Sequence, residues 1–223
     1  MAAERITASA FAELELHGWR WLGHQLRTQL RAGGFAEAAA LAGRIAVVAE
    51  ELDHHPLLDL RYPDRVLVTL WTHTAGGVTE LDVTLVRRID ELVAEAGATY
   101  EPRELRVTEL AIDAIDIEAV RPFWEAVLGY RGGPSAAEGR HDDLSDPLDQ
   151  GPDVWFQPMD APRPQRNRIH VDVWVPHDRV DEIREAALAA GGRLVSDAEA
   201  PSFWVLADPE GNEACLCTWM DRG

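Results

Sequence analysis

Two adjacent histidines stand where a helical pattern ends, in the stretch EELDHHP at residues 50–56. Pro56 disfavours helical geometry at His55, so we expect the imidazoles of His54 and His55 to leave the helix in different directions. Glu50 precedes His54 by four residues, a spacing at which two side chains share one helix face. A carboxylate at that distance and the negative end of the helix would both favour a protonated, oriented imidazole.

A third histidine, His73, ends a predicted strand in the stretch THTAGGVTELD. In the expected hairpin this strand pairs with the segment that follows the histidine pair, so the hairpin can return His73 toward His54 and His55. Two or three imidazoles and a carboxylate would then lie at one rim of a sheet. Because only imidazole titrates near neutral pH without perturbation, this cluster predicts acid/base catalysis.

Each of these residues also has a purely structural interpretation. A histidine at a helix C-terminus can act simply as a favourable cap, and Asp82 stands three residues after Thr79, the place of a capping-box acid. Metal binding by the pair is disfavoured, because adjacent residues do not share a helix face whereas residues four apart do.

The first hundred residues carry helical and strand periodicities in alternation. Helices are predicted over residues 5–16 and 35–53, and a third from a Thr79 cap to Gly97. Alternation of apolar and polar residues predicts two strands around Gly23 and a hairpin made of LLDLRY and RVLVTLWTH. Short strands linked by hairpins favour an antiparallel four-stranded sheet with three helices, an α+β fold.

The stretch GATYEPRE has no periodicity and is predicted to be a linker. A second pattern of strands and helices follows it. The order strand, helix, strands occurs twice after it, which indicates two similar halves packed together. We therefore predict two domains, residues 1–100 and residues 104–223, both of the α+β class.

The composition excludes several kinds of partner. The 39 acidic against 21 basic residues give a formal charge of −18, which repels phosphate backbones and anionic membranes. No apolar run approaches the roughly 20 residues needed to span a bilayer. Cys215 and Cys217 are two residues apart and cannot staple a fold together. We expect a cytoplasmic protein that binds neither nucleic acid nor membranes.

Residues 6–93 resemble the pterin-4a-carbinolamine dehydratases through GWR, through the run FAEAAALAGRIAVVAEELDHHP and through THTAGGVTELD. The resemblance implies a hydro-lyase that removes water from a 4a-hydroxytetrahydropterin to give the quinonoid dihydropterin, without metal or other cofactor. It implies catalytic roles for three histidines: His54 and His73 as the acid/base pair, and His55 holding and orienting the pterin. Members of that family often form homo-oligomers, which we expect here too.

The same resemblance implies substrate-binding roles for Glu50, Asp82 and Trp19. Glu50 would orient a histidine or contact the pterin, and Asp82 would support His73 from the next helix. Trp19 matches the tryptophan of the family's GW segment, with a simple core residue as the alternative. The sequence departs from the family at Trp71, which stands in LWTH where a smaller polar residue is frequent.

The second domain resembles the glyoxalase-like branch of the vicinal oxygen chelate superfamily through DIEAVRPFWEAVLGY, RNRIHVDVWV and DPEGNEACLC. That resemblance implies paired βαβββ modules, and active members hold a divalent metal with His and Glu side chains. Glu109, His170 and Glu213 would form an incomplete set of such ligands. A hydrogen-bonded structural role for His170, beside Asp172, is the favoured alternative.

Two other functional hypotheses remain beside the dehydratase. Relatives of the dehydratase fold also serve as dimerisation partners of transcription factors, which would make this chain an interaction protein. Alternatively the second domain carries the activity, as a metal-dependent lyase, isomerase or dioxygenase or as a small-molecule binder, and the first domain is a relic.

Overall fold

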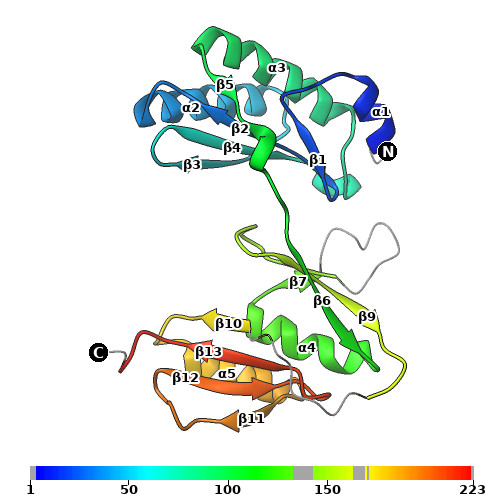
Figure 1. Ribbon diagram of the computed structural model, residues 1–223, viewed down its shortest axis with the longest axis vertical. Helices are drawn as coiled ribbons and strands as arrows, with labels where there is room; N and C mark the ends of the chain where they lie inside the picture. The colour runs from blue at the N-terminus through cyan, green and yellow to red at the C-terminus, as the bar shows by residue number, and fades with distance from the viewer. Residues whose placement is uncertain (1–3, 133–142, 163–168, 170, 222–223) are drawn as a thin grey trace. The chain divides into compact units, whose positions relative to one another are not determined.

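The computed structural model describes residues 4–132, 143–162, 169 and 171–221 of the chain (Figure 1). The chain divides into two compact units, Met1–Val107 and Thr108–Gly223, and the division falls just after the stretch predicted to be a linker. Among the described residues, no helix combines the length and the apolar character that crossing a membrane would require.

Unit 1 has the predicted order of helix, two strands, helix, two strands and helix (Figure 1). Its strands form an antiparallel sheet in the order β1-β2-β4-β3, and a short β5 also pairs with β2. The elements are α1 (Ala8–Glu13), β1 (Arg20–Leu22), β2 (Gln25–Arg31), α2 (Phe35–Glu51), β3 (Leu57–Arg61), β4 (Arg65–Leu70), the 3-10 turn η1 (His73–Ala75), α3 (Glu80–Ala96), β5 (Thr99–Tyr100) and the 3-10 turn η2 (Pro102–Glu104).

The core of unit 1 lies between its sheet and the helices α2 and α3. Alternate residues of a strand point to the same face, and on β4 this face carries Val66, Val68 and Leu70, all fully buried. They pack with apolar residues of α2 and α3 such as Ile45 and Ile89. The pairing register places Leu57 of β3 opposite Thr69 of β4, so the residues just before β3 lie beside the end of β4.

Strand β5 lies in the stretch that was predicted to be a linker. Tyr100 pairs with Leu30 of β2 and donates a hydrogen bond from its hydroxyl to Asp90 of α3. Burial, followed by this bond to a carboxylate, raises the pKa of Tyr100. The indole Nε1 of Trp19 also donates to Asp90, at 3.2 Å. One carboxylate on α3 therefore ties the two ends of unit 1 to the same helix.

Unit 2 contains two copies of one module. The first module contains β6 (Glu109–Ala114), α4 (Ile117–Leu128), β7 (Arg131–Gly132), β8 (Leu144–Ser145) and β9 (Asp153–Pro158). The second contains β10 (Val171–Trp174), α5 (Val180–Ala189), β11 (Arg193–Ser196), β12 (Phe203–Ala207) and β13 (Glu213–Cys217). Their sheets have equivalent orders, β6-β9-β8-β7 and β10-β13-β12-β11, with the first pair of each parallel. The predicted paired βαβββ fold is confirmed.

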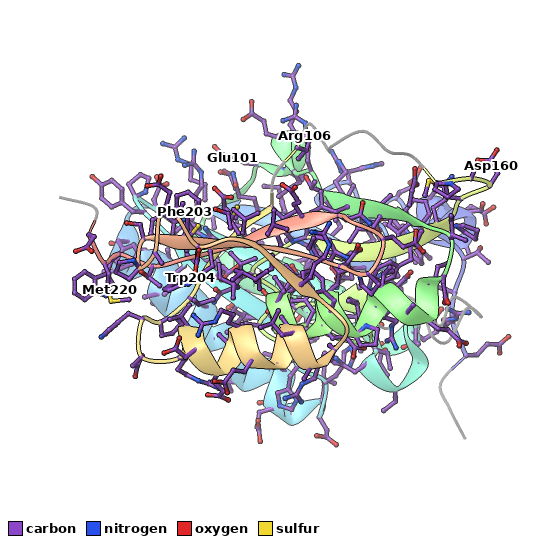
Figure 2. The ribbon with its side chains drawn as sticks, turned by 90° about the horizontal axis from the view of Figure 1, so that it is seen from below. Glu101, Arg106, Asp160, Phe203, Trp204 and Met220 are labelled. Atoms are coloured by element: carbon purple, nitrogen blue, oxygen red, sulfur yellow. The ribbon has the colours of Figure 1, made fainter. Side chains whose placement is uncertain are left out.

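Both helices of unit 2 pack against a shared apolar core. Phe123 and Trp124 of α4 are buried in it together with Trp204 and Leu206 of β12. Trp204 lies on the side of its sheet that α5 covers, where Arg184 stacks over the indole at 5.4 Å, whereas Phe203, the preceding residue, points to the other face (Figure 2). The strand alternation predicted from the sequence thus decides which side chains enter this core.

The contact of Tyr100 with Gly18 gives a test of this packing. A Cβ added at Gly18 would lie 2.6 Å from Cδ1 of Tyr100, whose ring cannot easily move because Asp90 holds its hydroxyl. We expect Gly18→Ala to lower the free energy of unfolding of unit 1 by about 1–3 kcal/mol through overpacking. Urea denaturation of the full chain, with amide hydrogen exchange in α3 reporting on unit 1, measures the change.

Gly43→Ala is the matched control. Gly43 lies inside α2, and among the described residues no atom outside the helix backbone lies within 4 Å of its added Cβ. Alanine in a helix interior is favoured over glycine by roughly 0.5–1 kcal/mol, so this substitution should stabilise unit 1. Equal effects of the two substitutions would contradict the packing described for Tyr100.

Candidate functional site

His54 occupies a defined position in the turn that ends α2. The N–H of His54 donates to the carbonyl of Ala49 and the N–H of Asp53 to that of Glu50, the two bonds of a Schellman motif. Asp53 has a positive φ of 49°, in the left-handed region where glycine is usual. The residue that follows normally packs back against the last turn of the helix. His54 therefore turns inward and is buried, with 7% of its surface exposed.

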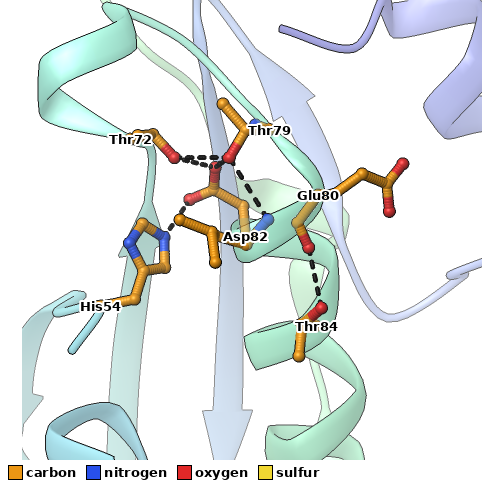
Figure 3. Close-up of polar contacts among 7 residues, drawn as sticks. His54, Thr72, Thr79, Glu80, Asp82 and Thr84 are labelled. Atoms are coloured by element: carbon orange, nitrogen blue, oxygen red, sulfur yellow. Dashed lines mark hydrogen bonds and ion pairs between the residues drawn. The ribbon is translucent and has the colours of Figure 1, made fainter. Parts of the chain in front are cut away.

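A buried imidazole needs a polar partner, and Asp82 provides it (Figure 3). Nε2 of His54 lies 2.7 Å from Oδ1 of Asp82, which is itself completely buried. The other oxygen, Oδ2, accepts from the backbone N–H of Thr79 at 2.7 Å and from the hydroxyl of Thr72 at 2.8 Å. Asp82 is thus the capping-box residue of α3 and the partner of His54 at once.

The network fixes which nitrogen of His54 carries a proton toward Asp82. An ionised carboxylate only accepts hydrogen bonds, so Nε2 donates to it. The Thr72 hydroxyl donates to Asp82, and the Thr79 hydroxyl, which accepts from the N–H of Leu81, can donate to Thr72 at 2.7 Å. Nδ1 of His54 has no hydrogen bond to any residue that the structure describes. A neutral His54 in this tautomer therefore presents Nδ1 as a proton acceptor.

His55 points away from this network, as Pro56 predicts. More than half of its side chain is exposed, and its Nε2 lies 2.9 Å from Oε2 of Glu50. The expectation that Glu50 faces His54 is wrong, because the helix ends before His54 and the turn moves His54 to the buried side. Glu50 instead orients the exposed imidazole of His55.

His73 begins the 3-10 turn η1 directly after Thr72. Because the hydroxyl of Thr72 donates to Asp82, the backbone of His73 lies close to the Asp82 network. Its imidazole is exposed and packs against the indole of Trp71, with ring centroids 4.2 Å apart. The expectation that Asp82 supports His73 is corrected: both carboxylate oxygens bind other groups, and the histidine at Asp82 is His54.

The two remaining predicted binding residues of unit 1 lie away from solvent. Trp19 is buried among core residues and donates to Asp90, and Asp82 has no exposed surface. Neither side chain is placed to touch a substrate directly in this geometry. Asp82 can act on one through His54, whereas the contacts of Trp19 are those of a core residue. Thr72 was not predicted as a site residue, although its hydroxyl holds the same carboxylate.

The metal ligands predicted in unit 2 are only partly described. Glu109 is exposed on β6 and Glu213 is half-buried on β13, whereas His170 lies outside the described residues. Within residues 4–132, 143–162, 169 and 171–221, no three His, Cys, Asp or Glu side chains gather closely enough to hold a metal ion. The described residues therefore do not fit a metal, and the set of three stays a prediction.

The thiol of Cys215 on β13 is not an activated nucleophile. Cys215 is buried, and burial followed by a hydrogen bond to Asp172 raises the pKa of its thiol to about 11. A thiol with this pKa stays protonated at neutral pH, and the thiolate is the reactive form.

Comparison with known proteins separates the two units. The family model described as pterin 4 alpha carbinolamine dehydratase matches residues 2–92, and that of the glyoxalase-like domain matches residues 109–217. A protein of Bordetella avium and one of Streptomyces avermitilis carry the provisional name pterin-4-alpha-carbinolamine dehydratase, and each is 45% identical to this chain. The matches cover 36% of this chain and 77% of the first relative, and 38% and 84% for the second.

A solved structure is also similar to unit 1. It is described as a transcriptional coactivator/pterin dehydratase from Brucella melitensis and is 33% identical to this chain. The similarity covers 40% of this chain and 98% of the other, with a TM-score of 0.38.

The double role of Asp82 gives a test of the network. Asp82→Ala would leave the donors of His54, Thr72 and Thr79 buried without an acceptor, so we expect unit 1 to lose about 3–5 kcal/mol of stability. Urea denaturation with hydrogen exchange in α3 measures this loss. In the wild type, the bonded Nε2–H of His54 should give a slowly exchanging imidazole N–H resonance that the variant lacks.

Glu80→Ala is the control, because Glu80 is an exposed acid in the same first turn of α3. Its interaction with the helix dipole is worth less than about 1 kcal/mol. If the two substitutions cost the same, Asp82 would be no more than another favourable charge at the helix start.

Proposed function

Because the chain belongs, through its first unit, to the pterin 4 alpha carbinolamine dehydratase family, we propose that it is a hydro-lyase acting on 4a-hydroxytetrahydropterins. The product is the quinonoid dihydropterin, and the other product is water. The observation that carries the proposal is the buried pair of His54 and Asp82, with exposed histidines at the same end of the sheet.

The reaction needs two proton transfers in opposite directions. The hydroxyl on the 4a carbon leaves as water after a proton is delivered to its oxygen, and the new imine forms as the neighbouring ring nitrogen loses its proton. The number of protons is conserved, because one histidine donates a proton to the substrate and the other accepts one from it. Two imidazoles therefore suffice, and each transfer contributes roughly 10² to 10⁴ to the rate.

His54 is assigned the base. Its Nδ1 accepts the proton from the ring nitrogen of the pterin, and the Asp82 carboxylate at Nε2 then stabilises the imidazolium that forms. The same carboxylate holds the ring in one tautomer and one orientation, as the carboxylate of a catalytic triad does for its histidine. Asp82 is thus a positioning residue.

His73 is assigned the acid, because its exposed imidazole can regain a proton from solvent after each turnover. His55, oriented by Glu50, is assigned the role of holding the pterin ring. No metal or cofactor takes part in these steps. The glyoxalase-like unit is accessory in this proposal and its ligand is left open. The predicted cytoplasmic location and homo-oligomeric state stay predictions.

Replacement of the two proton-transferring histidines tests the proposal. We expect His54→Ala and His73→Ala each to lower kcat for 4a-hydroxytetrahydropterin dehydration by about 10² to 10⁴, the size of one lost general acid or base. The decay of the carbinolamine absorbance in the presence of full-length protein measures turnover. Amide hydrogen exchange in α3 shows whether each variant is folded.

His17→Ala is the control, since His17 is an exposed histidine of unit 1 that precedes β1 and is remote in sequence from the pair. It should keep the wild-type rate. Wild-type protein that leaves the spontaneous decay unchanged would remove the proposal. Full activity in both His54→Ala and His73→Ala would remove the assigned roles.

A further inference from the structure

Trp71 is a buried tryptophan that lies outside the core of unit 1. Only 9% of its surface is exposed, yet among the described residues it is not part of the apolar cluster between the sheet and the helices. It follows Leu70, which points into that cluster, so Trp71 points to the opposite face of the sheet. Its ring neighbours there are two histidines, His73 and His24.

The backbone places Trp71 and His73 on the same side. Thr72 between them is extended, with φ of −85° and ψ of 103°, and residues on either side of an extended residue share a face. Their rings meet at a centroid distance of 4.2 Å and an angle of 47°. At this separation the two rings are in direct contact.

The main chain around His73 is held firmly, but its ring is not buried. Thr72 donates from its N–H to Gly77 at 2.9 Å and from its hydroxyl to Asp82, and the carbonyl of His73 accepts from Gly76. The imidazole is exposed, so packing in the core does not determine its rotamer. The Trp71 indole supplies a flat surface against which the ring can rest.

His24 is the second ring neighbour of Trp71. It stands in the β1–β2 turn, and pairing of Leu26 with Leu70 brings this turn beside Trp71. Its ring meets the indole edge to face, at 6.5 Å and 85°. Nε2 of His24 is buried and has no hydrogen-bond partner among the described residues. A buried polar atom without a partner is costly and calls for an explanation.

We propose that Trp71 is a positioning residue that fixes the orientation of the His73 imidazole, and that His24 supports Trp71 through its edge-to-face contact. The inference rests on the proposed function, since it gives His73 its direction toward the substrate. A general acid must lie within hydrogen-bond reach of the oxygen that it protonates, and a misplacement of about 1 Å can lower the rate 100-fold. The edge-to-face contact gives His24 a role in aromatic packing at this turn, although it does not supply a partner for Nε2.

The first measurement needs no substrate. The indole ring current should displace the Hδ2 and Hε1 resonances of His73 upfield, and these are assigned by their absence from the spectrum of His73→Ala. In Trp71→Thr we expect both resonances to move toward their positions in an unstructured peptide. Trp71→Phe should keep part of the displacement, and His24→Ala should reduce it. Unchanged His73 resonances in Trp71→Thr would overturn the inference.

The second measurement is kinetic. We expect Trp71→Thr to lower kcat for the 4a-hydroxytetrahydropterin by about 10- to 100-fold with a much smaller change in KM, because orientation and not binding is lost. Trp71→Phe should recover a large part of kcat. Trp174→Phe, an equivalent change at an exposed tryptophan of unit 2, should leave kcat unchanged. Wild-type kcat in Trp71→Thr, with the ring-current displacement gone, would also overturn the inference.

Failure of this inference and failure of the proposed function can be distinguished. Wild-type protein without dehydratase turnover would end the proposed function and the catalytic part of this inference, while the His73 resonances would still decide whether the stack exists. If Trp71→Thr does not fold, as hydrogen exchange in α3 would show, Trp71→Phe and His24→Ala decide the result. The inference would then be contradicted if Trp71→Phe and His24→Ala both had the His73 resonances and the kcat of the wild type.

Discussion

The arrangement of unit 1 depends on one buried carboxylate. A charge without exposed surface is stable only where hydrogen bonds replace the water it has lost, and Asp82 receives them from three separate segments. The N–H of Thr79 starts α3, the hydroxyl of Thr72 follows β4, and the imidazole of His54 follows α2. Helix start, strand end and histidine are therefore held in one geometry by the same two oxygens.

The helix end explains why spacing alone assigned the wrong partners. Helical spacing pairs Glu50 with His54 only if the helix continues, but Asp53 has a left-handed backbone and reverses the chain. His54 then turns inward, and Glu50 meets His55 instead. The partner of His54 lies 28 residues away, on α3. Local periodicity carries no information about such a contact, which only the packing of α3 against α2 creates.

The fold was more accessible from sequence than the site was. Apolar periodicity and capping residues predicted the helices of unit 1 and its hairpins, and the doubled order of elements predicted the modules of unit 2. The strands β5, β7 and β8 could not be predicted from the sequence, because two residues are too few to show an alternation of apolar and polar side chains. In β5, Tyr100 is ordered by Leu30 and Asp90, so a stretch read as a linker belongs to the sheet. The residue types of the site were predictable, and their partners were not.

The two duties of Asp82 affect what a comparison of sequences can reveal. A relative that had abandoned catalysis would still need an acid at this position to begin α3, since the Thr79 N–H would otherwise lack its acceptor. Persistence of the aspartate would then report on folding alone. The imidazole of His54 also serves the fold, because an apolar side chain at that turn would leave Oδ1 of the buried Asp82 without a donor. The exposed His73, and not the buried pair of His54 and Asp82, is then the marker by which members with and without the activity could be told apart.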